Sequence, residues 1–184
     1  MSLMSSQDRF RTDHGIDWAR LAVAVGALEA EGGQEHGGTS YACQAIETLL
    51  GEEALADAVD HYIAGHPGSE LARSVLWHIH SPRAMERCHE IYGSKAPLAS
   101  RRLAVELLRV VADARALPWA REFLDDPDEQ IQAWGIGLLD QLVFSKLVHP
   151  NDCPDLFNAA LSHKNPHVRE KAEEILAWQS GDSE

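Results

Sequence analysis

The sequence predicts an all-α protein, an α-solenoid of about five antiparallel helical pairs. Three observations support this fold class. A small residue recurs every 30 to 37 positions, apolar residues at helical spacing follow it, and proline or glycine separates the periodic segments. A period near thirty with helical spacing is typical of stacked helical pairs, which bury their core between neighbours. The small positions are Ala42, Ala72, Ala104, Gly135 and Ala172.

Ten helices are expected in order along the chain. Five first helices have apolar residues at i, i+3 and i+4, as amphipathic helices do. They cover residues 16–28, 52–63, 82–92, 116–124 and 153–161. Each second helix carries one small position followed by an apolar pair, such as Leu138 and Leu139 after Gly135. No stretch alternates as a half-buried strand would, so no sheet is expected.

Proline and glycine mark the expected helix boundaries. Proline is tolerated at a helix start, where its missing N–H needs no partner, and glycine is common just past a helix end. Prolines follow this rule in Ser81-Pro82, Asp126-Pro127 and Asn165-Pro166, and glycines do so at Gly51, Gly65, Gly68 and Gly93.

The chain divides into three expected parts. Residues 1–38 form an N-terminal segment with the first helix and a loop, EGGQEHGG (31–38), that we interpret as a flexible connection. Residues 39–180 form the helical repeat array, and residues 181–184 a polar tail.

Two stretches, LDDPDEQIQAWGIGLL and LSHKNPHVREKAEEIL, resemble units of the HEAT-repeat family, and LASRRLAVELL does so more loosely. Val168-Arg169, Ala172 and Leu176 match the second helix of such a unit. The resemblance covers roughly residues 39–179. It implies a HEAT-like superhelix in which second helices line a concave binding face, and in which Arg101 and Arg169 bridge neighbouring repeats.

The segment QAWGIGLLD (132–140) places two glycines inside an expected helix, although each costs about 1 kcal/mol relative to alanine. Gly135 occupies the shared small position, so we interpret it as a packing residue between helices. Gly137 lies about 200° around the helix from Gly135. Its sequence context gives no packing reason, and an unconstrained site is the simplest interpretation; the alternative is close approach by a partner's backbone.

The outward stripe of the second helices is the candidate partner-binding site. Trp and Arg are favoured anchors in protein interfaces, and the stripe contains both. The alternative for each Trp is that its ring only covers a neighbouring helix. The candidate residues are Tyr41, Gln44, Ser74, Trp77, Arg102, Glu106, Arg109, Trp134, Gly137 and Asp140.

Charge and motifs limit the possible functions. The net charge is −13, with 29 acidic against 16 basic residues, which disfavours nucleic acid. The acidity favours a basic partner, and the alternative is that it only keeps a cytosolic protein dispersed. No Walker loop, GxGxxG, GxSxG or HExxH occurs, and the histidines lack zinc-site spacing. We therefore expect no catalytic residue, cofactor or metal. Three dispersed cysteines, no signal-peptide pattern and no membrane-length apolar run favour a cytoplasmic protein that does not enter the membrane.

The sequence favours a non-catalytic protein-interaction module that binds a basic protein or peptide, for example as an immunity-type or regulatory protein. The resemblance also allows an enzyme, because HEAT-like alkylpurine DNA glycosylases and bilin lyases exist. A glycosylase reading would use Trp77, Trp134 and Asp140. A third hypothesis is a homo-oligomer or a subunit of a larger complex, since open solenoid ends expose apolar surface.

Overall fold

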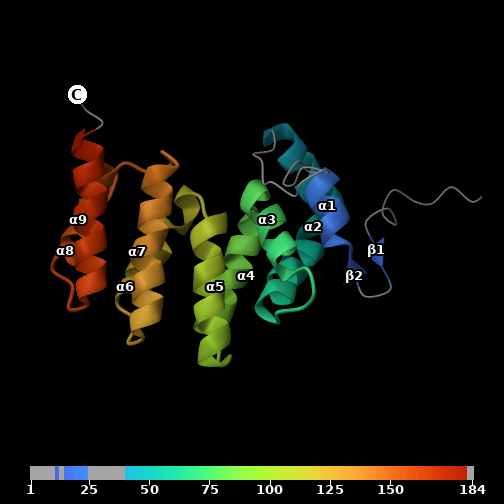
Figure 1. The fold of residues 1–184 in the computed structure, drawn as a ribbon, viewed down its shortest axis with the longest axis horizontal. Helices are drawn as coiled ribbons and strands as arrows, with labels where there is room; N and C mark the ends of the chain where they lie inside the picture. The colour runs from blue at the N-terminus through green and yellow to red at the C-terminus, as the bar shows by residue number, and fades with distance from the viewer. Residues whose placement is uncertain (1–10, 13–14, 25–39, 182–184) are drawn as a thin grey trace, which may run out of the picture. The chain divides into compact units, whose positions relative to one another are not determined.

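A computed structural model describes residues 11–12, 15–24 and 40–181, which form nine α-helices, two 3-10 helices and two short strands (Figure 1). The all-α fold class is therefore confirmed for this part of the chain. The α-helices are α1 (Trp18–Ala24), α2 (Ser40–Ile63), α3 (Ser69–Ile79), α4 (Pro82–Gly93), α5 (Leu98–Val111), α6 (Leu117–Leu124), α7 (Glu129–Phe144), α8 (Pro154–Leu161) and α9 (Pro166–Gly181).

The short elements are η2 (Ala114–Ala116), η3 (Pro150–Asp152), β1 (Arg11–Thr12) and β2 (Gly15–Ile16). The strands β1 and β2 pair antiparallel and were not expected. Two residues are too few to produce the alternation by which a strand is recognised in a sequence. The predicted Gly-rich loop (31–38) and the end of the polar tail (182–184) lie outside the described residues.

Helix α2 contains two of the ten expected helices. Its backbone leaves the helical conformation at Gly51, where φ is 76° and ψ is 166°. Glycine adopts a positive φ readily because it has no Cβ. Gly51 is thus the expected boundary, but it produces a kink within one assigned helix instead of a loop.

The chain forms two compact units, Met1–Arg87 and Cys88–Glu184, whose boundary lies inside α4. In unit 1, α3 packs against both α1 and α2. Its core includes Leu21, Leu55 and Leu76, which are almost fully buried. No helix in the described residues is both long enough and apolar enough to cross a bilayer.

Unit 2 has two layers of helices. Helix α7 packs between α5 and α9 in one layer, and α6 contacts α8 in the other (Figure 1). Consecutive helices pair across the layers, α6 with α7 and α8 with α9. This pairing is consistent with a helical repeat.

Gly135 lies in a close contact between α6 and α7, which confirms its interpretation as a packing residue. A Cβ added at Gly135 would be 2.8 Å from Phe123 Cβ and 3.3 Å from the backbone N of Leu124. Both distances are shorter than ordinary van der Waals contact. The equivalent residues Ala72, Ala104 and Ala172 are also fully buried.

The turn between α6 and α7 is held by Asp126, which is buried. Its carboxylate accepts hydrogen bonds from Arg101 Nη2 at 3.1 Å and from the Tyr92 hydroxyl at 3.1 Å, and Arg101 Nε also donates to the carbonyl of Tyr92. Arg101 therefore bridges neighbouring helical pairs, as expected. The hydrogen bonds of Arg169 do not bridge neighbouring helical pairs. Its guanidinium donates to the carbonyls of His163 and Lys164, in the turn just before its own helix α9.

Candidate functional site

The ten candidate residues divide between the two units. Unit 2 holds the six residues on α5 and α7, which are Arg102, Glu106, Arg109, Trp134, Gly137 and Asp140. Unit 1 holds the other four. The side chains of Tyr41 and Gln44 lie outside the described ones, although their backbone belongs to α2.

The two described candidates of unit 1 contribute little accessible surface. Ser74 is only 3% exposed, and its hydroxyl donates to the carbonyl of Glu70 at 3.0 Å. Its assignment to an exposed stripe was wrong, because α3 is covered by two helices, α1 and α2, and not by one. Trp77 is half-buried and stacks on His78, with ring centroids 5.4 Å apart.

Arg109, Trp134 and Gly137 form one contact between α5 and α7. The guanidinium carbon of Arg109 lies 4.8 Å from the Trp134 ring centroid, a cation–π geometry. A Cβ added at Gly137 would be 2.7 Å from Arg109 Cδ. The prediction that Gly137 is an unconstrained site was therefore wrong, because the absence of a side chain at Gly137 makes room for the aliphatic stem of Arg109.

Glu106 completes this contact from the same helix as Arg109. Its Oε1 lies 3.8 Å from Arg109 Nη2. The Nε of Arg109 is buried and has no hydrogen-bond partner among the described residues. The guanidinium is thus held on Trp134 by its ring contact and one ion pair, while part of it stays accessible.

Arg102 is engaged by the start of α7. Its Nε and Nη2 donate to the two carboxylate oxygens of Asp128 at 3.0 and 2.6 Å, and Asp128 caps α7 by accepting from the N–H of Ile131 at 3.1 Å. The hydrogen bonds from Arg102 are the main reason that the pKa of Asp128 lies below its ordinary value. The same pairing raises the pKa of Arg102. Its charge is therefore already matched within the chain.

Asp140 faces α9, where Lys171 Nζ lies 3.4 Å from its carboxylate and 3.1 Å from Glu174. The hydrogen bond to Glu174 is the largest cause that raises the pKa of Lys171, and Asp140 acts in the same direction. Asp140 therefore pairs with a cation of its own chain. If Asp140 were the acidic residue of a DNA glycosylase, it would have to give up this ion pair with Lys171.

Two exposed aromatic side chains extend this surface and were missed by the sequence analysis. Phe144 at the end of α7 is 66% exposed, Trp178 on α9 is 39% exposed, and their ring centroids are 5.8 Å apart. Phe144 follows Gly137 by seven residues, or two helical turns, and Asp140 by four, so extending the stripe by one more turn would have found it.

The contacts define a second-helix face on unit 2. Around α7, Trp134 borders this face toward α5 and Asp140 borders it toward α9, each about 60° from Gly137. The face consists of Arg102, Glu106, Arg109, Trp134, Gly137, Asp140, Phe144, Lys171, Glu174 and Trp178.

The described residues include no group of three His, Cys, Asp or Glu side chains that could hold a metal ion. Cys153 is buried, and burial is the main cause that raises the pKa of its thiol, with Asp152 adding to the effect. A raised pKa keeps the thiol protonated and a poor nucleophile. The second-helix face itself displays aromatic rings and paired charges.

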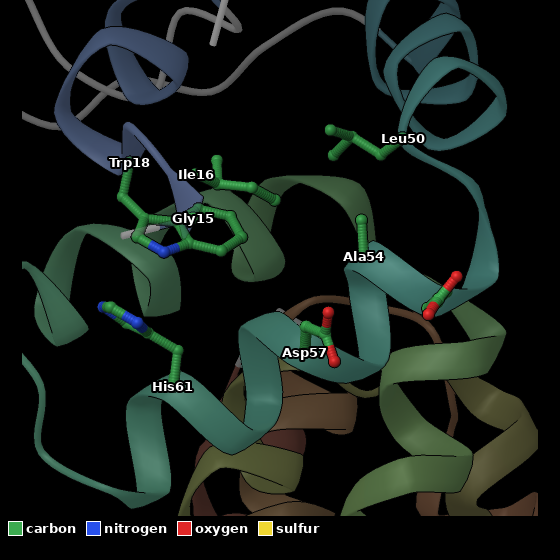
Figure 2. Close-up of a pocket in the computed structure, with 8 residues that line it drawn as sticks. Gly15, Ile16, Trp18, Leu50, Ala54, Asp57 and His61 are labelled. Atoms are coloured by element: carbon green, nitrogen blue, oxygen red, sulfur yellow. The ribbon is translucent and has the colours of Figure 1, made fainter. Parts of the chain in front are cut away.

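Unit 1 contains a pocket of about 330 Å³ between β2, the start of α1 and one face of α2 (Figure 2). No local sequence pattern indicates this pocket, because its walls come from segments more than thirty residues apart that meet only in the folded chain. The lining residues are Gly15, Ile16, Trp18, Leu50, Glu53, Ala54, Asp57 and His61.

No protein-family model matches the chain, and neither a curated protein nor a solved structure matches it. The resemblance to HEAT repeats thus stays a hypothesis that depends on the quoted residues. The interpretation of both sites depends on their own geometry and chemistry.

Proposed function

We propose that the chain is a non-catalytic protein-interaction module with a HEAT-like α-solenoid architecture, and that its second-helix face binds a protein partner. The architecture is supported by the recurring small residue and by the two layers of unit 2, in which α7 lies between α5 and α9. In such a repeat the core is buried between neighbouring pairs, and one face stays available for binding.

The observation that carries the proposal is the alignment of aromatic and arginine side chains along this face, with Phe144 and Trp178 exposed and Arg109 and Trp134 partly buried. Arg109 lies on Trp134, and almost three turns further along α7 the exposed ring of Phe144 contacts the exposed ring of Trp178 on α9. Large exposed apolar side chains that cluster, with charged residues around them, are typical of interaction surfaces. Trp and Arg held in place by their neighbours lose little entropy on binding, which makes them suitable anchors.

The partner is expected to be basic. The chain has a net charge of −13, and two acidic side chains of the face, Asp140 and Glu174, are 41% and 68% exposed. A negative field accelerates the encounter with a positive partner and makes it sensitive to salt. An immunity-type or regulatory protein that neutralises a basic partner would have these properties.

Affinity purification from the native host tests the proposal with two matched double variants. Arg109→Ala/Trp134→Ala removes one Arg and one Trp from the second-helix face. Trp119→Ala/Arg121→Ala removes the same two residue types from α6, in the other layer of unit 2. Circular dichroism and urea unfolding establish first that both variants are folded.

The expected result is a partner that is retained by the wild type and by the α6 variant, lost with the face variant, and released by salt. A partner lost with the α6 variant and retained by the face variant would contradict the proposal, as would equal retention by all three proteins.

A further inference from the structure

We propose that the pocket of unit 1 binds an organic cation, specifically an alkylammonium or guanidinium group. The pocket volume of about 330 Å³ is at the small end of the range for ligand sites. Its walls combine an aromatic ring, aliphatic side chains and two carboxylates, which together fit a cation that carries an apolar stem. The inference is independent of the second-helix face, since every lining residue lies in unit 1.

The carboxylates of Glu53 and Asp57 supply the negative charge. They are exposed, lie one turn apart on α2 and both line the pocket. Figure 2 labels Asp57 on this face of the helix. Neither has a hydrogen-bond or ion-pair partner among the residues that the structure describes, whereas the next acid on this helix, Asp60, is bound by Arg87 at 3.0 and 3.1 Å. Like charges at i and i+4 repel each other on a helix, so a bound cation would relieve an existing repulsion.

Trp18 supplies an aromatic wall opposite α2. It is 5% exposed, and its ring lies 5.8 Å from that of His61, so packing fixes its position. Cations bind favourably over an indole face, and the attraction increases where water is excluded. Ile16, Leu50 and Ala54 add aliphatic surface for the stem of the ligand.

His61 contributes a polar group that does not oppose a cation when the ring is neutral. Its Nε2 lies 3.1 Å from the carbonyl oxygen of Pro67 and therefore donates to it. In the neutral ring the other nitrogen, Nδ1, is then an acceptor. The pocket thus combines two anionic groups, an imidazole and an aromatic face.

Such a cation has two possible sources, a free small amine or the Lys or Arg side chain of a protein partner. Both present the same group to Trp18, Glu53 and Asp57. Small probes and short peptides distinguish these sources when they are compared on the same protein.

The test uses the ¹⁵N-labelled full chain and follows the indole N–H signal of Trp18, which is assigned by its loss in Trp18→Phe. Four probes are titrated: n-butylammonium, the uncharged n-pentanol, the peptide acetyl-Gly-Lys-Gly-amide, and the same peptide with norleucine in place of lysine. Each is titrated into the wild type, into Glu53→Gln/Asp57→Asn, and into Glu52→Gln/Glu86→Gln. The last variant makes the same charge change on two exposed acids that do not line the pocket.

We expect a saturable shift of the Trp18 signal with a charged probe and none with its uncharged counterpart. The affinity should fall about tenfold or more in the pocket variant, and stay unchanged in the control variant. Binding of n-butylammonium would identify a free amine as a sufficient ligand, and binding of the lysine peptide alone would assign the site to a partner's side chain. Equal shifts with charged and uncharged probes, equal affinity in the pocket variant, or no shift with any probe would overturn the proposal.

Discussion

The two sides of helix α7 are built in opposite ways, although the same sixteen residues form both. On the side toward α6, Gly135 sits against the backbone of Leu124 and the Cβ of Phe123, and Asp126 is buried at the end of the contact. On the side toward α5 and α9, Gly137 faces the stem of Arg109, and Asp140 is paired at the surface with Lys171.

This difference shows that one residue type can have two roles within a single helix. Gly135 is close to atoms that cannot move without shifting a helix, so its contact is rigid. Gly137 is close to a flexible side chain, so its contact can adjust. The two carboxylates differ in the same way. That of Asp126 is buried with its partners, whereas that of Asp140 is exposed, so that solvent screens its charge. The inner side stabilises the fold, and the outer side is the one that we propose binds a partner.

The two carboxylates give the largest expected contrast. Asp126→Ala removes the acceptor of Arg101 and Tyr92 from a buried site, and we expect the free energy of unfolding to fall by about 2–4 kcal/mol. Asp140→Ala removes an exposed ion pair and should cost less than about 1 kcal/mol. Urea unfolding of both variants measures the difference, and equal losses would show that the two sides of α7 do not differ as described.

Gly135→Ala is expected to have the next largest effect. The new Cβ would be 2.8 Å from Phe123 Cβ, so α6 and α7 must separate at a cost of about 1–3 kcal/mol. At the middle of this range, about 2 kcal/mol, the cost exceeds the gain of about 1 kcal/mol from alanine's helix propensity. Chemical denaturation should show a net loss of stability. A more stable Gly135→Ala protein would show that the helices are not in close contact there.

Tyr92 adds a pH dependence to the inner side. Burial is the main cause that raises the pKa of its hydroxyl to about 12, with the neighbouring Asp126 adding to the effect. A folded-state pKa above the unfolded value of about 10 means that the protonated hydroxyl stabilises the fold below pH 10, and that this stability is lost as the pH rises toward 12.

Tyr92→Phe should therefore lose about 1 kcal/mol at pH 8, because the hydrogen bond to Asp126 is absent, and should show a smaller further decrease between pH 9 and 11 than the wild type. Unfolding curves at several pH values test this. Parallel pH profiles for the two proteins would exclude Tyr92 as the titrating group.

Gly137→Ala is expected to have the smallest effect on stability, within about 0.5 kcal/mol of zero. The gain in helix propensity is offset by displacement of Arg109 from Trp134, a contact of about 0.5–1 kcal/mol. In an Arg109→Ala background the displacement has no cost, so the same substitution should stabilise by about 1 kcal/mol. A double-mutant cycle measures the coupling energy between the two positions. Additive effects of the two substitutions on the free energy of unfolding would show that Gly137 does not act through Arg109.

The sequence predicted the helices well because each one depends on local signals. Apolar spacing, Pro82 and Pro166 at helix starts, and Gly51 at a boundary are all encoded within a few residues. Gly135 was also identified correctly, since the recurring small position reports a repeated contact.

The candidate site was predicted less well because its contacts join different helices. Gly137 had no visible role until the side chain of Arg109, on another helix, was placed beside it. Ser74 was assigned to the surface because periodicity predicts a helix at residues 16–28 but not that this helix packs against α3. The pocket around Trp18 likewise requires the approach of distant segments.

The most direct test of the central claim compares the indole N–H signals of Trp134 and Trp119 when a captured basic partner is added to the ¹⁵N-labelled chain. These two residues lie on the two layers of unit 2, on α7 and α6. If the second-helix face binds the partner, the signal of Trp134 shifts or broadens at substoichiometric partner and that of Trp119 stays in place. A response of Trp119 with Trp134 and Trp178 unchanged would place the partner on the other layer and contradict the account.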